Sequence, residues 1–389
     1  MKKKVVILLQ SLQQGGLSVS LLEALNIVDL TQYDITIYVY SNNNPWRDFF
    51  PKEINIIVDT DKTHYHRRPK AIWYHICILF FKIINNHRLK TVFEKKLHTF
   101  VHKKKAKYPA RRYFKPGVDV VISYALGLCT EMAVEINANR KYLFFHSSKP
   151  DFHRDICEKC FYYFDNIIAV GTNVQEMLKK TYPIFADRIV TIKNYLDPKR
   201  IISLANDYKV DTLKYKKEYV FTSVIRLDKE KGADLLVDVA FQLKKKGVSF
   251  VWFVVGDGDC RSKVEKLINR KSLSDSVILV GFQDNPYPYI SCCDYYIHPA
   301  YEESFGLAIL EALILDKFVL STDTMGADEV LAHGEFGVLV PIDSLALANN
   351  IIACIDNPVR STKDYTQYYE GERDEYKLKW TTILDGKCL

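Results

Sequence analysis

The sequence lacks any long apolar run. No stretch of the 389 residues approaches the roughly 18–20 consecutive apolar residues that a membrane-spanning helix requires. The first apolar segment, Val5–Leu9, follows three lysines and has only five residues, which is too short for the core of a secretory signal. We therefore interpret this segment as a first β-strand and expect the protein to remain in the cytoplasm.

The nine cysteines form neither a disulfide framework nor a metal-binding pattern. Cys157 and Cys160 have C-x-x-C spacing, but no second pair stands at the spacing of a zinc site. The length excludes a small disulfide scaffold, so we expect buried free thiols in a reducing compartment. Asp257 and Asp259 have the D-x-D spacing of some metal sites, yet they lie in a glycine-rich turn. The sequence therefore predicts no metal site.

Acidic residues are almost absent between Lys62 and Lys115. This segment holds 16 Lys and Arg residues against a single acid, Glu94, in a chain of net charge +7. It also contains an aromatic, apolar stretch at residues 71–82, and the combination is typical of an interfacial helix on an anionic membrane. We predict that residues 62–115 contact such a membrane; the alternative is an apolar face packed in the domain core with solvated cations. No nucleic-acid-binding module accompanies the charge, so nucleic acid is not an expected partner.

Short apolar runs alternate with helical stretches along the whole chain. Near-continuous apolar runs are typical of parallel strands covered on both faces, and their alternation with helices indicates an α/β, doubly wound architecture. A first series of strands is predicted at Val5–Leu9, Ile35–Tyr40, Ile54–Val58, Val118–Ser123, Tyr142–Phe145, Ile167–Val170 and Ile189–Lys193. A second series is predicted at Val220–Ile225, Val251–Val255, Val277–Val280, Tyr295–His298, Phe318–Ser321 and Val338–Val340.

A charged stretch, residues 202–218, separates the two series of strands. We predict two Rossmann-like domains, residues 1–205 and 206–365, that face each other across a cleft. A terminal helix over residues 366–389 is expected to cross back to the first domain or to close the second. Ligands of such sheets bind beyond the carboxyl ends of the strands, so the cleft is the expected site.

Two loops at the predicted cleft suit a phosphate group. Gly15 and Gly16 follow the first strand, where glycine lets the backbone approach an anion at the start of a helix. Arg226 and Lys231 follow the strand Val220–Ile225, and Arg226 can hold two phosphate oxygens through its guanidinium. The alternatives are an ordinary turn for the glycines and a solvated loop for the cations.

The third candidate segment for binding a phosphate is the decapeptide E-S-F-G-L-A-I-L-E-A at residues 303–312. Ser304 is predicted to cap a helix whose first turn offers N–H groups to an anion. Glu303 precedes this helix and Glu311 lies inside its apolar sequence, where a carboxylate is costly unless it has a partner. The two carboxylates are expected to hold the two ends of one extended ligand; the alternative for Glu311 is a structural salt bridge.

Together these motifs resemble glycosyltransferase family 4, a retaining, metal-independent group with the GT-B fold that includes enzymes of bacterial surface polysaccharides. The resemblance rests on E-x7-E with Phe305-Gly306 inside it, R-L-x3-K-G from Arg226, the N-terminal Gly-Gly loop, and Asn285-Pro286-Tyr287 before Asp294. It is dense from Val220 to Pro341 and sparse between Ser41 and Pro116. Ile225 and the pair Leu17-Ser18 depart from the family pattern.

The resemblance implies a role for each matching position. Glu303 would bind the sugar hydroxyls, His146 would face the reacting sugar, and Arg226 and Lys231 would neutralise the donor diphosphate, so these four are the catalytic candidates. Glu311 would bind the ribose hydroxyls of the nucleotide. The remaining donor-binding candidates are Gly15, Gly16, Gly256, Phe282, Ser304, Phe305, Gly306 and Leu307.

The function implied is transfer of a sugar, with retention, from a nucleotide-diphosphate donor such as a UDP-sugar. The acceptor would be a saccharide or a polyprenyl-linked saccharide in the synthesis of capsule or another cell-surface polysaccharide. No metal or other cofactor is expected, and the protein would lie peripherally on the inner face of the cell membrane. The alternatives are a nucleotide-sugar epimerase on the same fold and a non-catalytic, donor-binding partner subunit.

Overall fold

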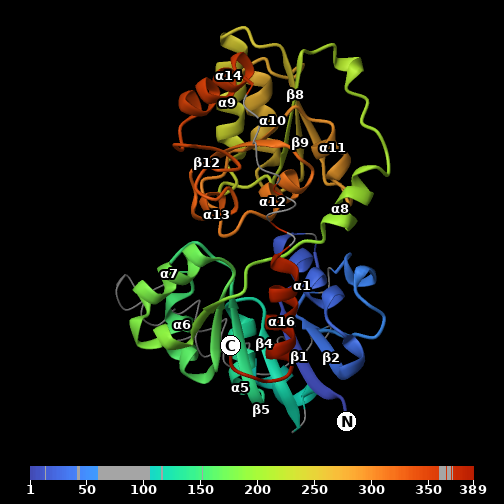
Figure 1. Cartoon of the computed structure of the whole chain (residues 1–389), viewed down its shortest axis with the longest axis vertical. Coiled ribbons are helices and arrows are strands. Elements are labelled where there is room, and N and C mark those ends of the chain that lie inside the picture. The colour runs from blue at the N-terminus through green and yellow to red at the C-terminus, as the bar shows by residue number, and fades with distance from the viewer. Residues whose placement is uncertain are drawn as a thin grey trace, which may run out of the picture.

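A computed structural model of the chain describes residues 1–13, 15–41, 44–59, 106–114, 117–150, 152–358, 365, 369 and 371–389. The described residues form two domains, each built on one parallel β-sheet (Figure 1). The first sheet has seven strands and the second has six. The predicted architecture of two doubly wound α/β domains is confirmed.

The first sheet has the strand order β3-β2-β1-β4-β5-β6-β7, and every neighbouring pair is parallel. Its strands are β1 (Lys3–Leu9), β2 (Tyr33–Val39), β3 (Asn55–Val58), β4 (Val118–Ser123), β5 (Ala138–Phe145), β6 (Asn166–Ala169) and β7 (Ile189–Thr191). The helices connected to it are α1 (Gly16–Ile27), α5 (Leu128–Glu135), α6 (Arg154–Cys160), α7 (Thr172–Thr181) and α8 (Pro198–Ala205). The order reverses between β1 and β4, which places the switch point at the start of α1.

The second sheet has the strand order β10-β9-β8-β11-β12-β13 and is also parallel. Its strands are β8 (Tyr219–Val224), β9 (Phe250–Val255), β10 (Val277–Gly281), β11 (Tyr295–His298), β12 (Phe318–Thr322) and β13 (Gly337–Val340). The helices connected to it are α9 (Ala233–Lys245), α10 (Arg261–Arg270), α11 (Tyr287–Ser291), α12 (Leu307–Ile314), α13 (Met325–Val330) and α14 (Ser344–Asp356). Here the order reverses between β8 and β11, so the loops after these two strands lie together.

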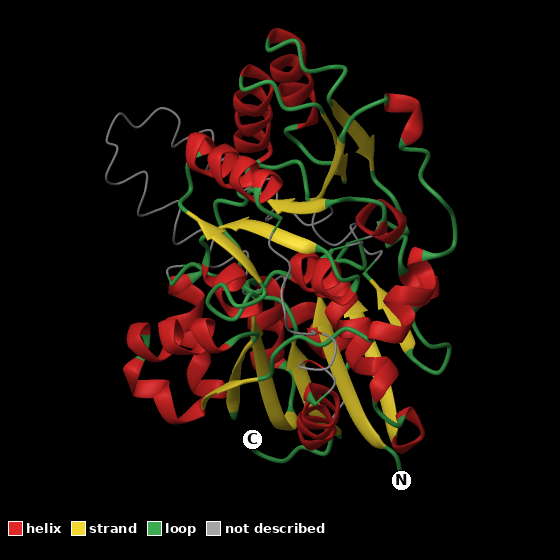
Figure 2. Cartoon of the chain, turned by 45° about the horizontal axis from the view of Figure 1, so that its top comes forward, coloured by secondary structure: helices red, strands yellow, loops and turns green. Residues whose placement is uncertain are grey.

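Apolar burial explains why these segments form central strands. All residues of β9 are buried, as are Val5–Leu9 of β1, because helices cover both faces of each sheet (Figure 2). A strand with two covered faces has no solvated side on which polar residues could alternate. The eight described cysteines are free thiols, and five of them are buried.

The C-terminal helix α16 (Glu372–Leu384) packs on the first domain, although α14, the preceding helix given above, belongs to the second (Figure 1). Trp380 is fully buried and stacks on Phe144 of β5, with ring centroids 5.1 Å apart. The Tyr376 hydroxyl donates to the carbonyl of Ser20 in α1 at 3.3 Å. The helix therefore contributes to the core of a domain built from the other end of the chain.

The junction between the domains runs through α8. The predicted boundary, residue 205, is the last residue of this helix, and α8 contacts α11 and α12 of the second domain. Its residue Arg200 also forms an ion pair with Glu23 of α1 in the first domain. The helix is thus an element of the interface and contacts both sides of it.

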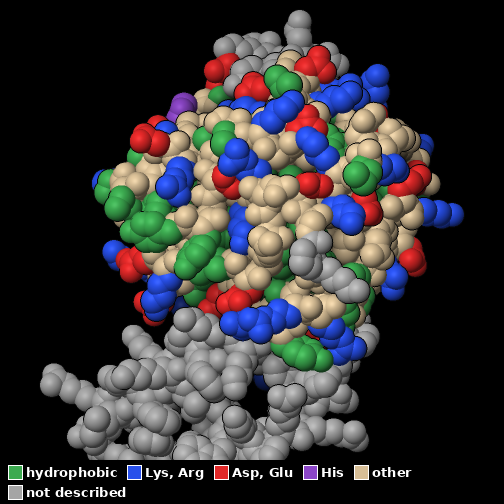
Figure 3. Space-filling view, turned by 90° about the horizontal axis from the view of Figure 1, so that it is seen from below, with side chains coloured by type: hydrophobic (Ala, Val, Ile, Leu, Met, Phe, Trp, Pro, Cys, Tyr) green, Lys and Arg blue, Asp and Glu red, His purple; other side chains and the backbone are tan. Residues whose placement is uncertain are grey.

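Most of the basic segment lies outside the described residues. Positions 62–105 and 115, which carry most of the segment predicted to contact membrane, are among those not described. In the part of the chain that is described, no helix is long and apolar enough to cross a membrane. Basic and acidic side chains are interspersed on the described surface of the face seen in Figure 3.

Candidate active site

The loop after β8, residues 226–232, is folded around Asp228. One carboxylate oxygen of Asp228 accepts from the Lys231 backbone N–H at 2.9 Å, and the other pairs with the Arg226 guanidinium. The Arg226 side chain is 65% exposed. It therefore extends from the end of a buried strand into open space, where a phosphate can reach it.

Gly232 presses this loop against the loop after β11. It has φ +66°, and a Cβ added there would lie 1.8 Å from the backbone oxygen of Pro299. Only glycine permits both the left-handed conformation and this close approach. The contact holds Lys231 beside the segment that carries Glu303.

We expect Gly232→Ala to destabilise the protein more than Gly247→Ala. Gly247 also has positive φ, at +80°, but no atom lies within 4 Å of its added Cβ, so it carries only the conformational cost of about 1–2 kcal/mol. The clash at Gly232 adds roughly 1–3 kcal/mol. Urea unfolding of both variants measures the difference, and equal costs would show that the close approach to Pro299 is unimportant.

Glu303 is held by two side chains and its own loop. Its Oε2 lies 2.7 Å from Lys231 Nζ and 3.1 Å from Nε2 of His298, the last residue of β11. Its Oε1 accepts from the Ser304 backbone N–H at 3.2 Å. Burial disfavours the charged carboxylate, but the Lys231 ammonium and the His298 hydrogen bond together hold the pKa of Glu303 well below its usual range. Glu303 is therefore ionised at neutral pH.

Two helix N-termini from different domains meet beside this carboxylate. A Cβ added to Gly16, the first residue of α1, would lie 3.4 Å from Cδ1 of Leu307, the first residue of α12. The first-turn N–H groups of a helix have no partner within it and carry partial positive charge. Both helices therefore present anion-binding ends to one place between the domains.

The prediction that Ser304 caps α12 is wrong. The helix begins at Leu307, its N-cap is Gly306 with φ 96°, and no side chain caps it. The left-handed Gly306 turns the chain between Ser304 and the helix, so the serine lies too far upstream to cap the first turn. Phe305 is buried in the same loop. The uncapped end leaves the N–H groups of α12 available to a ligand.

Glu311 lies in the second turn of α12 and is 8% exposed. The Tyr287 hydroxyl of α11 donates to its Oε1 at 3.3 Å. Burial raises the pKa of Glu311 to about 7, against the opposing effects of the Tyr287 hydrogen bond and the Arg200 guanidinium. No salt-bridge partner lies within 4 Å of Glu311 among the described residues, so its partners are a hydroxyl and a more distant cation.

His146 follows β5 on the first domain and is neutral. Burial lowers the pKa of its imidazole to about 3. Its ring packs against those of Tyr124 and Phe144, with centroid distances of 4.7 and 5.9 Å, and its buried Nε2 has no hydrogen-bond partner among the described residues. Tyr124 in turn shares a 2.9 Å hydrogen bond with Ser20 of α1. The imidazole can thus donate or accept one hydrogen bond but does not supply a positive charge.

The other predicted residues lie around these groups. Gly256 follows β9, and a Cβ there would lie 2.0 Å from the backbone oxygen of Ile225, so this turn packs on the base of the loop with Arg226. Gly15 precedes α1 with open space beside it. Phe282 follows β10 and is half-exposed. Among the predicted residues, Lys231 contacts Glu303, and Gly16 lies against Leu307.

Comparison with known proteins shows which proteins this chain is similar to. Residues 205–373 match the family described as "Glycosyl transferases group 1". A structure of Anabaena HepE in complex with UDP and glucose has a TM-score of 0.64 and 18% identity, and the match covers 99% of this chain and 98% of HepE. Staphylococcus aureus TarM, in a complex containing UDP, has a TM-score of 0.69 and 13% identity over 98% of this chain and 99% of TarM. The match to a glycosyltransferase family thus covers residues 205–373, and the whole chain has the GT-B fold.

Sequence relatives of this GT-B protein carry glycosyltransferase names. A 4-alpha-N-acetylgalactosaminyltransferase of Campylobacter jejuni, named for a diphospho-undecaprenol-linked saccharide, is 30% identical over 162 residues, 39% of this chain. The match spans 44% of that relative, and the match to a Methanocaldococcus jannaschii glycosyltransferase spans 49% of its length, so both cover less than half. A lipopolysaccharide core biosynthesis glycosyltransferase of Rhizobium meliloti is 28% identical over 260 residues, 66% of this chain and 71% of the relative.

Contacts across the cleft join the two domains of this GT-B protein. Lys149 of the first domain lies 2.7 Å from Glu230 and 2.9 Å from Glu302 of the second. Near the N-terminus of α7, the Thr172 and Asn173 backbone N–H groups donate to the carboxylate of Glu329 in α13, at 2.7 and 3.0 Å. The helix dipole of α7 thus stabilises a carboxylate of the opposite domain.

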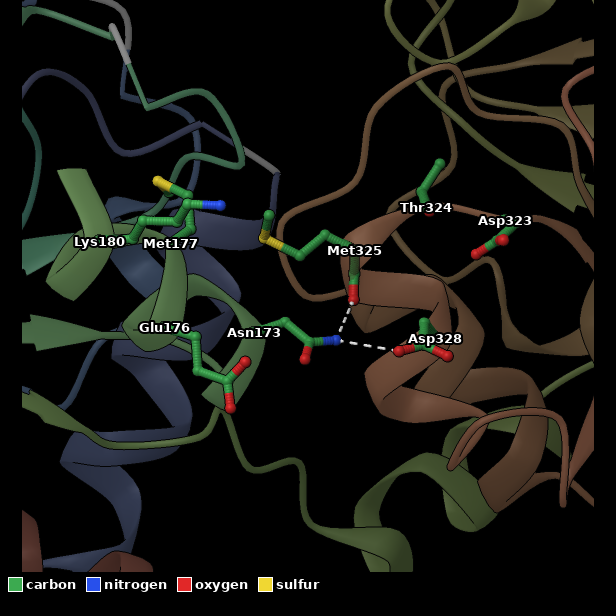
Figure 4. Close-up of a pocket in the computed structure, with 8 residues that line it drawn as sticks. All are labelled: Asn173, Glu176, Met177, Lys180, Asp323, Thr324, Met325 and Asp328. Atoms are coloured by element: carbon green, nitrogen blue, oxygen red, sulfur yellow. Dashed lines mark hydrogen bonds between the residues drawn. The ribbon is translucent and has the colours of Figure 1, made fainter.

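A cavity of about 470 Å³ lies beside the contact between α7 and α13 (Figure 4). Asn173 donates across it to the Met325 carbonyl at 3.0 Å and to Asp328 at 3.2 Å. The remaining lining comes from Glu176, Met177, Lys180, Asp323 and Thr324. The cleft is therefore partly open on this side although polar contacts cross it.

Sequence reasoning missed several residues that shape the site. His298 holds Glu303 and Asp228 holds the loop with Arg226, while Arg200 and Glu329 lie at the interface of the domains. A signal existed for His298, because a polar residue ends an otherwise apolar strand five positions before Glu303. No local signal marks Arg200, whose partner Glu23 is 177 positions away.

Proposed function

We propose that this protein is a retaining glycosyltransferase that moves a sugar from a UDP-sugar to a saccharide acceptor without a metal ion. The observation that carries the proposal is the meeting of two helix N-termini, at Gly16 and Leu307, beside the Lys231–Glu303 pair. This arrangement provides backbone N–H groups and a cation where a diphosphate would lie. The resemblance to glycosyltransferase family 4 supports retention of the anomeric configuration.

The mechanism that fits this geometry is electrostatic. When the bond between sugar and diphosphate breaks, the leaving nucleoside diphosphate gains negative charge. Lys231, Arg226 and the N–H groups of α1 and α12 are already in place to stabilise that charge, so they favour the transition state over the ground state. In other enzymes a divalent cation supplies this charge. Glu303, ionised and fixed between Lys231 and His298, would accept hydrogen bonds from the sugar hydroxyls.

The identity of the donor nucleotide is inferred from the other residues of the site and from proteins of similar structure. Glu311 would accept from the ribose hydroxyls, and Phe282 would lie beside the base. The UDP complexes of HepE and TarM support uridine diphosphate as the leaving group. Domain closure over the donor would exclude water and favour transfer over hydrolysis.

We propose a lipid-linked saccharide as the acceptor, in the synthesis of a cell-surface polysaccharide. The name of the Campylobacter jejuni relative, which specifies a diphospho-undecaprenol-linked saccharide, supports this class. Such an acceptor would place the protein at the inner face of the cell membrane, with residues 62–115 as the proposed contact.

Transfer from UDP-sugars in the presence of excess EDTA tests the proposal. We expect a saccharide product from at least one UDP-sugar, with the rate unchanged by EDTA, because protein groups supply the positive charge. Loss of transfer with EDTA and its recovery with Mg²⁺ or Mn²⁺ would contradict the metal-free mechanism. Conversion of the UDP-sugar to its epimer without acceptor would favour an epimerase, and UDP binding without turnover would favour a non-catalytic subunit.

A further inference from the structure

A polar cluster, buried except for the partly exposed Arg200, lies where α1, α8, α11 and α12 meet. It consists of Glu23, Arg200, Tyr287 and Glu311, one residue from each helix. Glu23 is 3% exposed and its carboxylate pairs with Nη2 of Arg200, while the Asp197 backbone N–H donates to its other oxygen at 3.2 Å. Tyr287 connects to Glu311 through its hydroxyl. Because α8 packs against α11 and α12, the two pairs lie together at the junction of the domains.

The cluster holds two carboxylates for one guanidinium. Burial raises the pKa of Glu23 and that of Glu311, and Arg200 opposes the rise at both. Glu23 in addition raises the pKa of Glu311 through charge repulsion. One cation is thus shared between two acids that burial drives toward the neutral form.

The ionisable groups around Glu311 are few. Among the described residues, those that interact with it electrostatically are Tyr287 on α11, Arg200 on α8, Glu23 on α1 and Tyr296 on β11. Burial raises the pKa of both tyrosines well above the usual value, so they stay neutral near pH 7. Arg200 is the cation in this set, and its buried Nε has no hydrogen-bond partner among the described residues.

We propose that Arg200 is a positioning residue for donor binding. Its guanidinium keeps the Glu311 carboxylate charged and available to the ribose hydroxyls, while the Glu23 carboxylate competes with Glu311 for the same guanidinium. This inference rests on the proposed function, which assigns the ribose to Glu311. A charged carboxylate accepts hydrogen bonds from both ribose hydroxyls, whereas the protonated acid must use one oxygen as a donor. Nucleotide affinity then depends on a helix that joins the two domains.

The proposal predicts opposite effects for two substitutions. Arg200→Gln removes the attractive charge, so Glu311 takes up its proton at higher pH and nucleotide affinity is lost earlier as the pH falls. Glu23→Gln removes the repulsive charge, so affinity persists to lower pH. A role of Arg200 in stability alone would weaken binding equally at every pH.

The experiment measures the Kd of UDP by calorimetry between pH 5.5 and 9. For wild type we expect affinity to fall as the pH drops through about 7, the pKa of Glu311. In Arg200→Gln the midpoint should rise by about one pH unit, which weakens binding about fivefold at pH 7 and restores it near pH 9. In Glu23→Gln the midpoint should fall, and Arg200→Lys should restore most of the wild-type curve. Donor KM, rather than kcat, should follow these shifts.

A nucleotide control separates the ribose from the phosphates. The terminal phosphate of UDP itself titrates near pH 6, roughly like a phosphate monoester. The 2′,3′-dideoxy analogue of UDP shares that titration but lacks both hydroxyls, so its curve should be the same in wild type and in both variants. An analogue curve that shifts as UDP does would overturn the assignment to the ribose.

The outcomes distinguish the inference from the proposed function. Failure of the wild-type protein to bind UDP at any pH would overturn the proposed function and this inference with it. UDP binding with midpoints unmoved in Arg200→Gln and Glu23→Gln would overturn the inference alone. If thermal unfolding shows that Arg200→Gln does not fold, Glu23→Gln and the neutral double variant Glu23→Gln/Arg200→Gln decide, because loss of both charges should leave the midpoint between those expected for the two single variants.

Discussion

Replacing Glu303 by glutamine should lower kcat for sugar transfer by about 10²–10³-fold, with a much smaller change in UDP affinity. The amide keeps the size of the side chain but loses the charge that pairs with Lys231 and His298. Glutamine also presents only one acceptor oxygen to the sugar hydroxyls. Steady-state kinetics with the UDP-sugar that supports transfer gives kcat, and calorimetry with UDP gives the affinity.

The pH profile adds a second readout for this substitution. The pKa of Glu303 lies well below its usual range, so Glu303 does not titrate in an assay between pH 6 and 9. The acidic limb of the profile should therefore keep its position in Glu303→Gln, while the whole curve falls.

A surface carboxylate provides the matched control. Glu158 lies on α6 with half of its side chain exposed and pairs with Arg154 on the same helix. Glu158→Gln should leave transfer at the wild-type rate. Near-normal turnover in Glu303→Gln, or in the more severe Glu303→Ala, would show that the sugar does not lie against this carboxylate.

Trp380→Ala should destabilise the protein by about 3–5 kcal/mol. Trp380 is fully buried in α16 and packs against Phe144, Tyr124 and Tyr376, so its loss leaves a large cavity at the seam between the C-terminal helix and the first domain. Urea unfolding followed by circular dichroism measures the effect.

Two variants of the same helix calibrate this result. Trp380→Phe keeps an aromatic ring and should cost less than the alanine change. Leu378 is 66% exposed, so Leu378→Ala should change the stability by no more than about 0.5 kcal/mol. A cost for Trp380→Ala as small as that for Leu378→Ala would mean that α16 does not dock on the first domain in solution.

The thirteen strands of the described residues could be predicted from the sequence because a parallel strand covered on both faces is a contiguous apolar run. The clearest difference is β5, which begins at Ala138 rather than Tyr142. Its first four residues are polar or only partly buried, and they extend the strand through backbone pairing with β4 that no apolar pattern reports. Pairing between strands is a long-range property, so the apolar pattern predicts a strand that is too short where its end lies outside the core.

The residues of the candidate site could also be predicted only in part. Glu303, Lys231 and Gly16 were predicted because each lies in a motif at the end of a strand; the structure pairs Lys231 with Glu303 and places Gly16 against Leu307. The cap at Ser304 was predicted wrongly because the left-handed turn at Gly306 is not determined by the residues next to it alone. Arg200 could not be found at all, since its partners come from three other helices. The membrane contact of residues 62–115 stays a prediction.

The return of α16 to the first domain has a consequence for synthesis of the protein. The second domain is an insertion between the two parts of the first, and Trp380 reaches its neighbours only after residues 206–358 have left the ribosome. The nascent chain therefore exposes part of the apolar surface around Phe144 and Tyr124 until α16 has been synthesised. The second domain can fold while the first still lacks α16.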